Sequence, residues 1–291
     1  MKKMNKIALL LAGLAAGNSA QAQEGRLVAA DKSYIFSSTT DADGTGNISY
    51  QWFRNGEAIP NATGEIYVLP AELANGANVE FKRGARSTTC AGNISYSNIF
   101  FVTFCKGLVV GSLCWATTNV DDYQTFAIRP DMYTKFYQWN NATAWDATAQ
   151  TLVGWSYSPI TSAVLTNNPC PAGWRLPTRE EYQALLSGSV PVGGTWVGAN
   201  VRGNAVAGRF YGVNSATCTL PNNMDGCVFL SAVGSRYDNY GTLYQQGNIG
   251  RYWSGTSVSS NYAYCMNFDS STSTLLSNVE KENGRTVRCV R

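Results

Sequence analysis

Residues 23–104 alternate short apolar runs with turn residues, at intervals typical of an all-β unit. Apolar and polar positions alternate from Ile48 to Arg54, so Ile48, Tyr50 and Trp52 are expected on one face of a strand. Asn55-Gly56 follows directly and marks a tight hairpin turn. Further strands are predicted at residues 33–37, 66–69, 78–83 and 97–103.

From Cys105 onward the pattern changes to short strands and long polar loops around one helical segment. After Pro177, Thr178 is expected to cap a helix, and Glu181 three residues later completes a capping box. The apolar stripe of this helix and its end are predicted at Tyr182, Leu185, Leu186 and Ser187-Gly188. A short hairpin is predicted at residues 108–116, and strands are predicted at residues 209–212, 227–230, 251–254, 263–268 and 286–290.

Residues 1–22 have the pattern of an export signal. Lys2, Lys3 and Lys6 give a positive start, and the apolar stretch from Ile7 to Ala16 is too short to span a bilayer. Small residues around Ala22 favour cleavage after it. The alternative is an uncleaved anchor. No later segment has the pattern of a transmembrane helix, so export to the cell surface or the extracellular space is expected.

Composition narrows the possible partners and cofactors. Charged residues make up 14% of the chain, against roughly 25% in average soluble proteins. A net charge of +3 gives no reason to expect a nucleic-acid partner. The eight cysteines are an even number in an exported chain and predict disulfides. Since histidine and CxxC spacings are absent, no metal site and no cofactor are expected.

Two resemblances to known families suggest the folds. The segment Tyr50–Gly56, followed by Pro60–Thr63, resembles the immunoglobulin-like repeats of secreted bacterial surface proteins, although the cysteine pair of antibody domains is missing. The resemblance implies a β-sandwich over residues 23–104 with Trp52 at its centre.

Residues 105–291 resemble the FISUMP (Fibrobacter succinogenes major paralogous) domain. The resemblance lies in four ordered segments, residues 111–120, 136–140, 170–181 and 252–256, and in the closing residues 284–290. The family is linked to the C-type-lectin-like fold and to exported proteins and fimbrial tips of Bacteroidetes-like bacteria. The resemblance therefore implies an α+β, C-type-lectin-like C-terminal domain.

The cysteine pairing follows partly from this resemblance. In lectin-like folds the start of the helix is often tied to the last strand, which implies Cys170–Cys289. Two local links are also predicted, Cys218–Cys227 and Cys105–Cys114. The main rival is Cys265–Cys289, and Cys90 and Cys265 have no assigned partner.

Tryptophans supply the expected core of this domain. Trp174 and Leu176 precede the helix and are expected to pack beneath it. Trp253 is expected in the core, where burial of its side chain is worth a few kcal/mol, at roughly 25 cal/mol per Å². The alternative for Trp253 is stacking against a ligand.

No catalytic residues are predicted. Without histidine the chain has neither a Ser-His-Asp nor a Cys-His arrangement. It also has no phosphate-binding loop. Calcium-dependent lectins of this fold bind sugars through Glu-Pro-Asn or Gln-Pro-Asp and Trp-Asn-Asp. None of these motifs occurs here, and Trp253 is followed by Ser254-Gly255. We expect a protein that is not an enzyme.

The segment from Ser235 to Asn283 is rich in Tyr, Ser and Asn, which also dominate antibody paratopes. Ligand binding is predicted at Tyr237, Asp238, Tyr240, Tyr244, Arg251, Ser257, Ser259, Asn261, Tyr262 and Tyr264. Alternation from Tyr262 to Phe268 predicts that Ala263, Cys265 and Asn267 share one face. The segment also resembles the variable regions of diversity-generating retroelement targets. The alternative is that it has the ordinary loop composition of a β-rich exported domain.

These observations predict an exported, non-enzymatic, adhesin-like protein that recognises a glycan or protein ligand at the cell surface. Fimbrial subunits are further candidate partners. One alternative is a structural pilin-type subunit. The other is an enzyme of the formylglycine-generating, sulfatase-modifying lineage, whose chemistry would need an activated cysteine such as Cys265.

Overall fold

The computed structural model describes residues 24–29, 34–37, 46–70, 79–89, 94–97, 99–237 and 239–291. The predicted signal segment, Cys90 and Asp238 lie outside these residues. The chain forms two compact units, Met1–Lys106 and Gly107–Arg291. In the described part of the chain, no helix is long and apolar enough to cross a membrane.

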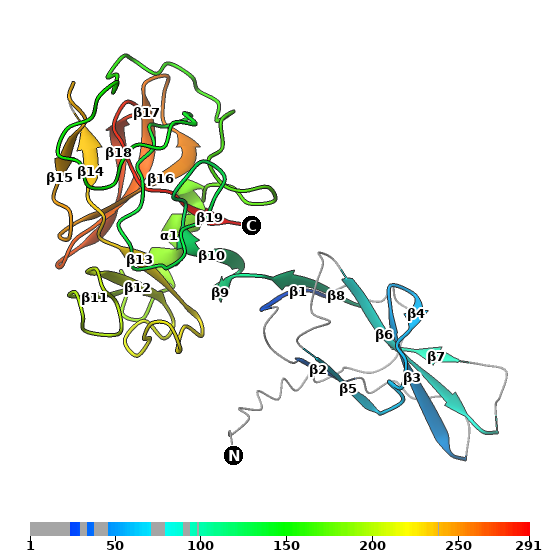
Figure 1. The fold of residues 1–291 in the computed structure, drawn as a ribbon. Coiled ribbons are helices and arrows are strands. Elements are labelled where there is room, and N and C mark those ends of the chain that lie inside the picture. Colours follow the sequence, from blue (N-terminus) through cyan, green and yellow to red (C-terminus); the bar gives the residue numbers. More distant parts are fainter. Residues whose placement is uncertain are drawn as a thin grey trace. The chain divides into compact units, whose positions relative to one another are not determined.

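The described part of the first unit consists of strands (Figure 1). One sheet contains, in order, β1 (Glu24–Ala29), β8 (Phe100–Cys105), β6 (Val79–Ser87), β3 (Ile48–Arg54) and β4 (Glu57–Ala58), with β7 (Ser95–Tyr96) beside β6. A second sheet pairs β2 (Tyr34–Ser37) with β5 (Ile66–Leu69). Strand β1 runs parallel to β8. Asn55 and Gly56 have φ of 49° and 83°, as the predicted tight turn between β3 and β4 requires.

Trp52 is the centre of the first unit, as its place in the alternating strand predicts. Its side chain is 0% exposed. Its ring lies 6.1 Å from the rings of both Phe36 and Tyr67, on the strands of the second sheet. Phe81 on β6 stacks on Phe36 at 4.7 Å. Aromatic side chains therefore join the two sheets.

The second unit contains several small sheets and one helix (Figure 1). Its strands form the sheets β19-β10-β9, β11-β12-β13, β14-β15 and β16-β17-β18. Their bounds are β9 (Leu108–Val110), β10 (Leu113–Asn119), β11 (Thr195–Val197), β12 (Gly208–Gly212), β13 (Cys227–Ser231), β14 (Ser235–Tyr237), β15 (Thr242–Tyr244), β16 (Gly250–Ser257), β17 (Tyr262–Phe268), β18 (Ser273–Glu280) and β19 (Arg288–Val290). The chain is thus rich in β-structure, with one short helix.

Helix α1 (Arg179–Ser187) begins and ends where the sequence predicts. The Thr178 side chain accepts from the Glu181 backbone N–H, and the Glu181 carboxylate accepts from the Thr178 N–H at 2.8 Å. The buried face of α1 packs into a cluster that we call the helix-side core. Its members include Trp115, Tyr182, Leu185, Leu186, Tyr252, Met266 and Phe268.

A second core lies on the other face of the β16-β17-β18 sheet. It contains Trp139, Leu176, Trp253, Ala263, Cys265 and Val287. The expectation that Trp253 belongs to the core is confirmed, because it is 1% exposed. The strand alternation is also confirmed, since Cys265 lies in the second core and Met266 in the helix-side core.

The placement predicted for Trp174 and Leu176 is wrong. Both pack in the second core instead of beneath the helix, and the Trp174 ring meets Phe126 edge-on at 5.5 Å. The reason is a contact between two segments that are far apart in the sequence. Arg175 pairs with Val290 through two backbone hydrogen bonds of 2.8 and 2.9 Å, which fixes the chain before α1 against the last strand.

Two disulfides join the cysteines that the sequence analysis paired, Cys170–Cys289 and Cys218–Cys227. Cys105 and Cys114 are both disulfide-bonded, and their pairing with each other stays a prediction. The rival Cys265–Cys289 link is wrong, because Cys265 is a free, buried thiol.

Candidate ligand-binding surfaces

Tyr237 and Tyr244 lie side by side on the β14–β15 hairpin. Ser235 pairs with Tyr244, and Tyr237 pairs with Thr242, so these four residues share one face of the hairpin. The ring centroids of the two tyrosines are 4.9 Å apart, and their planes are inclined by 58°. Tyr237 is partly exposed and Tyr244 is exposed.

Arg236 occupies the opposite face of the hairpin and anchors it. Its three guanidinium nitrogens donate to the carbonyls of Asp146, Gly241 and Ala149 at 2.9, 2.6 and 2.6 Å. The side chain is 0% exposed, and this burial lowers its pKa. Gly241 has φ of +63°, and a Cβ there would lie 2.8 Å from the Trp155 ring. The Arg236 hydrogen bonds and the close approach of Gly241 to Trp155 together determine which face of the hairpin is exposed.

Arg251 on β16 extends the tyrosine pair onto the neighbouring sheet. Its Nε donates to Asn267 Oδ1 at 3.0 Å, and its Nη1 donates to Ser235 Oγ at 3.3 Å. Its guanidinium carbon lies 5.7 Å from the centroid of the Tyr244 ring. We call Tyr237, Tyr244, Arg251 and Asn267 the hairpin patch. Three of these four were predicted as ligand residues.

Arg285 lies close to the patch and is buried. It is 4% exposed, and its Nη1 donates to the carbonyls of Gly284 and Arg236 at 3.1 and 3.3 Å. Its Nε has no hydrogen-bond partner among the described residues. Burial lowers the pKa of Arg285 to about 10; the charge of Arg251 contributes to this fall, and Cys265 opposes it. The two guanidinium groups are therefore near enough to repel each other.

Both arginines also act on Tyr237. Burial and the neighbouring Tyr244 raise the pKa of Tyr237, while Arg251 and Arg285 oppose that rise. In the described part of the chain, no carboxylate lies within ion-pair distance of either arginine. The hairpin patch thus combines two aromatic rings with a positive charge that no carboxylate among the described residues pairs with.

The predicted residues of the loop after β16 lie in a different place. Lys281 is buried, and its Nζ donates to Ser257 Oγ at 2.8 Å and to the Ser259 carbonyl at 2.7 Å. The Ser259 hydroxyl accepts from the backbone N–H groups of Asn261 and Tyr262. The hydroxyls of both serines therefore hold the loop together. Exposed Tyr262 lies five residues from Asn267 along β17, or ~17 Å.

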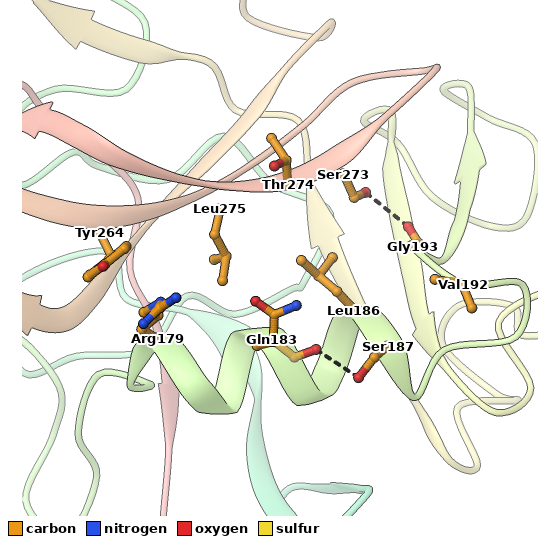
Figure 2. Close-up of a pocket in the computed structure, with 10 residues that line it drawn as sticks. All are labelled: Arg179, Gln183, Leu186, Ser187, Val192, Gly193, Tyr264, Ser273, Thr274 and Leu275. Atoms are coloured by element: carbon orange, nitrogen blue, oxygen red, sulfur yellow. Dashed lines mark hydrogen bonds between the residues drawn. The ribbon is translucent and has the colours of Figure 1, made fainter.

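Tyr264 lines a groove between α1 and β18, shown in Figure 2. The groove has a volume of about 430 Å³, and the Arg179 guanidinium lies 4.9 Å from the Tyr264 ring centroid at one end. Tyr264 alternates with Cys265 and therefore faces the helix side of the sheet. Arg251 pairs with Asn267 on the other face, so the groove and the hairpin patch are separate surfaces.

The predicted site residues thus divide into several places. Tyr237, Tyr244 and Arg251 come together, and Tyr240 lies 70% exposed at the hairpin turn. Asp238 lies outside the described residues. Asn267 and Arg285 were not among the predicted site residues. The strand alternation already placed Asn267 on one face with Cys265, but nothing local relates Arg285 to Tyr237.

A comparison with known families finds one family that matches the second unit. The profile of the Fibrobacter succinogenes major domain matches residues 97–291, about two-thirds of the chain. No curated protein and no solved structure matches the chain.

Proposed function

The chain belongs to the Fibrobacter succinogenes major domain family, and we propose that it is an exported, non-enzymatic binding protein. The second unit binds a glycan or protein ligand at the cell surface, and the hairpin patch makes the contact. The single observation that carries this proposal is the convergence of Tyr237, Tyr244 and Arg251 from three strands. Tyr and Arg are the residues that most often dominate the energy of binding interfaces.

Several features support the rest of the proposal. Disulfides such as Cys170–Cys289 persist in oxidising compartments outside the cytosol. This disulfide joins the segment before α1 to the last strand, which supports a C-type-lectin-like fold for the second unit. Buried Trp52 between two sheets supports an immunoglobulin-like first unit.

The proposal that the protein is not an enzyme draws support from Cys265. This thiol is buried, and burial raises its pKa although Arg285 and Arg251 oppose the rise. A catalytic cysteine needs a lowered pKa and access to its substrate. Cys265 lacks both properties in this structure.

The test is an array of glycans and surface proteins probed with the purified chain. Any ligand found is then titrated against Tyr237→Ala/Tyr244→Ala, with Tyr262→Ala and Tyr264→Ala as controls. The double variant is expected to lose about 30-fold in affinity, since central interface tyrosines contribute about 2 kcal/mol or more. Full affinity in a folded double variant would place the binding site elsewhere.

A structural, pilin-type subunit is the second candidate. Strand β18 is the edge of its sheet and pairs with β17 alone among the described strands. Between Ser273 and Val279 it contains neither lysine nor proline, the residues that usually protect an edge. This candidate predicts concentration-dependent polymers of the purified protein that Asn278→Lys, at an exposed position of β18, disrupts. A protein that stays monomeric in sedimentation at high concentration contradicts it.

A further inference from the structure

We propose that the hairpin patch recognises an anionic group, a carboxylate or a sulfate, on an acidic polysaccharide. This inference rests on the proposed binding function and names the chemical class of the ligand. Arg251 would hold the anion directly, and the rings of Tyr237 and Tyr244 would lie against the adjoining sugar.

Charge is the first argument. The Arg251 guanidinium donates to Ser235, and the Arg285 guanidinium donates to the carbonyl of the adjacent Arg236, so two positive groups lie at one end of the hairpin. No carboxylate among the described residues lies within ion-pair distance of either group. Glu280 is bound by the Tyr157 hydroxyl at 2.6 Å instead of by an arginine. Burying an unpaired charge is costly, so a bound anion offsets a cost that the free protein carries.

Geometry is the second argument. The hydrogen bonds to Asn267 and Ser235 fix the Arg251 guanidinium on one edge, through Nε and Nη1. Its Nη2 has no partner among the described residues. A guanidinium held in this way is ready to donate to a planar anion without losing further side-chain entropy. The partly exposed Arg251 supplies the contact, and buried Arg285 adds positive field from below.

The surroundings favour a saccharide over a peptide. The two tilted tyrosine rings offer apolar faces with hydroxyl tips. The Asn267 amide NH₂ has no partner among the described residues, and exposed Thr274 pairs beside it in the sheet. These groups suit a ligand with C–H faces and many hydroxyls. A peptide strand would instead use a free sheet edge such as β18, and Arg251 does not lie on that strand.

The experiment uses the full chain and matched pairs of polymers. Polygalacturonate is compared with its methyl ester, and dextran sulfate with dextran, so that the two members of each pair share a sugar backbone and one of them lacks the anionic group. At least one acidic polymer is expected to bind at least tenfold more tightly than its neutral counterpart. A preference within the polygalacturonate pair indicates that the patch recognises a carboxylate, and a preference within the dextran pair indicates a sulfate. Binding of poly-glutamate is measured as well, to test whether the ligand is an acidic polypeptide instead.

Arg251→Gln is expected to weaken binding of the acidic polymer at least tenfold, and Arg251→Lys to fall between it and the wild type. Arg179→Gln removes the same charge from the opposite face of the sheet, and we expect its affinity to stay within twofold. If Arg251→Gln does not fold, Tyr244→Ala retains all charges and is expected to lose about tenfold.

Three outcomes would overturn the inference. The first is no preference for acidic polymers. The second is an equal loss in Arg251→Gln and Arg179→Gln, which indicates general surface charge. The third is poly-glutamate binding with the same dependence on Arg251. If a neutral ligand binds through Tyr237 and Tyr244 without Arg251, the inference fails while the proposed function stands. If no ligand depends on the tyrosines, the proposed function fails.

Discussion

Arg236 and Arg251 have the same side chain and opposite roles, because the tertiary structure gives them different partners. Three backbone carbonyls surround the Arg236 guanidinium, so its hydrogen-bonding capacity serves the fold. Arg251 is bonded to two side chains, and its Nη2 is left without a partner among the described residues. One arginine therefore stabilises the hairpin, while the other keeps the donor on which the proposed anion contact depends.

Glu181 gives a prediction about acid stability. Burial alone raises its pKa, but hydrogen bonds from Arg175 and from the Thr178 N–H outweigh burial and lower it. Since the folded pKa lies below the unfolded value, its contribution is present above about pH 4.5 and is lost as pH falls through the folded pKa. Glu181→Gln is expected to cost about 1 kcal/mol at pH 7 and less at pH 3, measured by urea unfolding.

Glu180→Gln is the control for this measurement. The Glu180 side chain is 72% exposed, and its loss is expected to change the free energy of unfolding by less than about 0.5 kcal/mol. A difference between wild type and Glu181→Gln that does not change with pH contradicts the role of the carboxylate.

Cys265 gives a prediction about thiol chemistry. Because the thiol is buried and burial raises its pKa, an alkylating reagent is expected to leave it unmodified in the native protein at pH 8. Peptide mapping after labelling locates the modified cysteine. Complete labelling is expected in denaturant. Fast labelling of Cys265 in the folded state would restore the enzyme alternative.

At the scale of elements, the β14–β15 hairpin is too short to be stable alone, because three residues on each strand bury little surface. Its position depends on Arg236 on one face and on the Ser235–Arg251 hydrogen bond on the other. The loop after β16 is held differently, through the buried Lys281 ammonium. A buried cation thus helps to order each of these two segments, Arg236 the hairpin and Lys281 the loop.

Arg236→Met is expected to lower the free energy of unfolding by about 3 kcal/mol, because it leaves three carbonyls without their donor, and that of Gly241 is buried. Hydrogen exchange is expected to rise first at the amides of β14 and β15. Arg179→Met serves as a control, since the Arg179 side chain is 49% exposed and its carboxylate partner Glu180 is 72% exposed. Unchanged exchange in the hairpin would show that Arg236 does not position it.

At the scale of the whole molecule, the second unit is closed by its own ends. Strand β19 lies beside β10, and the Cys170–Cys289 disulfide ties the segment before α1 to β19. The β16-β17-β18 sheet separates two cores, and each strand contributes side chains to both. This arrangement places Arg251 and Tyr264 on opposite faces.

The two disulfides are expected to differ in their effect on stability. Cys170–Cys289 spans 119 residues and Cys218–Cys227 spans nine. In the chain-entropy model, loops of these lengths contribute about 5 and about 2.5 kcal/mol. Denaturant unfolding of the Cys170→Ser/Cys289→Ser and Cys218→Ser/Cys227→Ser variants measures both. Equal losses would indicate that native contacts, and not loop length, set the stabilisation.

The sequence alone determined the elements whose causes are local. The capping box of Thr178 and Glu181, the Asn55-Gly56 turn, the burial of Trp52 and the alternation along β17 all follow from neighbouring residues. It also predicted three members of the hairpin patch from composition. Local rules suffice here because the period of a helix or strand fixes which side chains share a face.

Only the tertiary structure decided which of the predicted ligand residues lie together. It placed Tyr264 across the sheet from Arg251, used the hydroxyls of Ser257 and Ser259 within their loop, and moved Trp174 away from the helix. It also brought Arg285 beside Arg251. These relations depend on contacts between segments far apart in the chain, and neither periodicity nor composition contains that information.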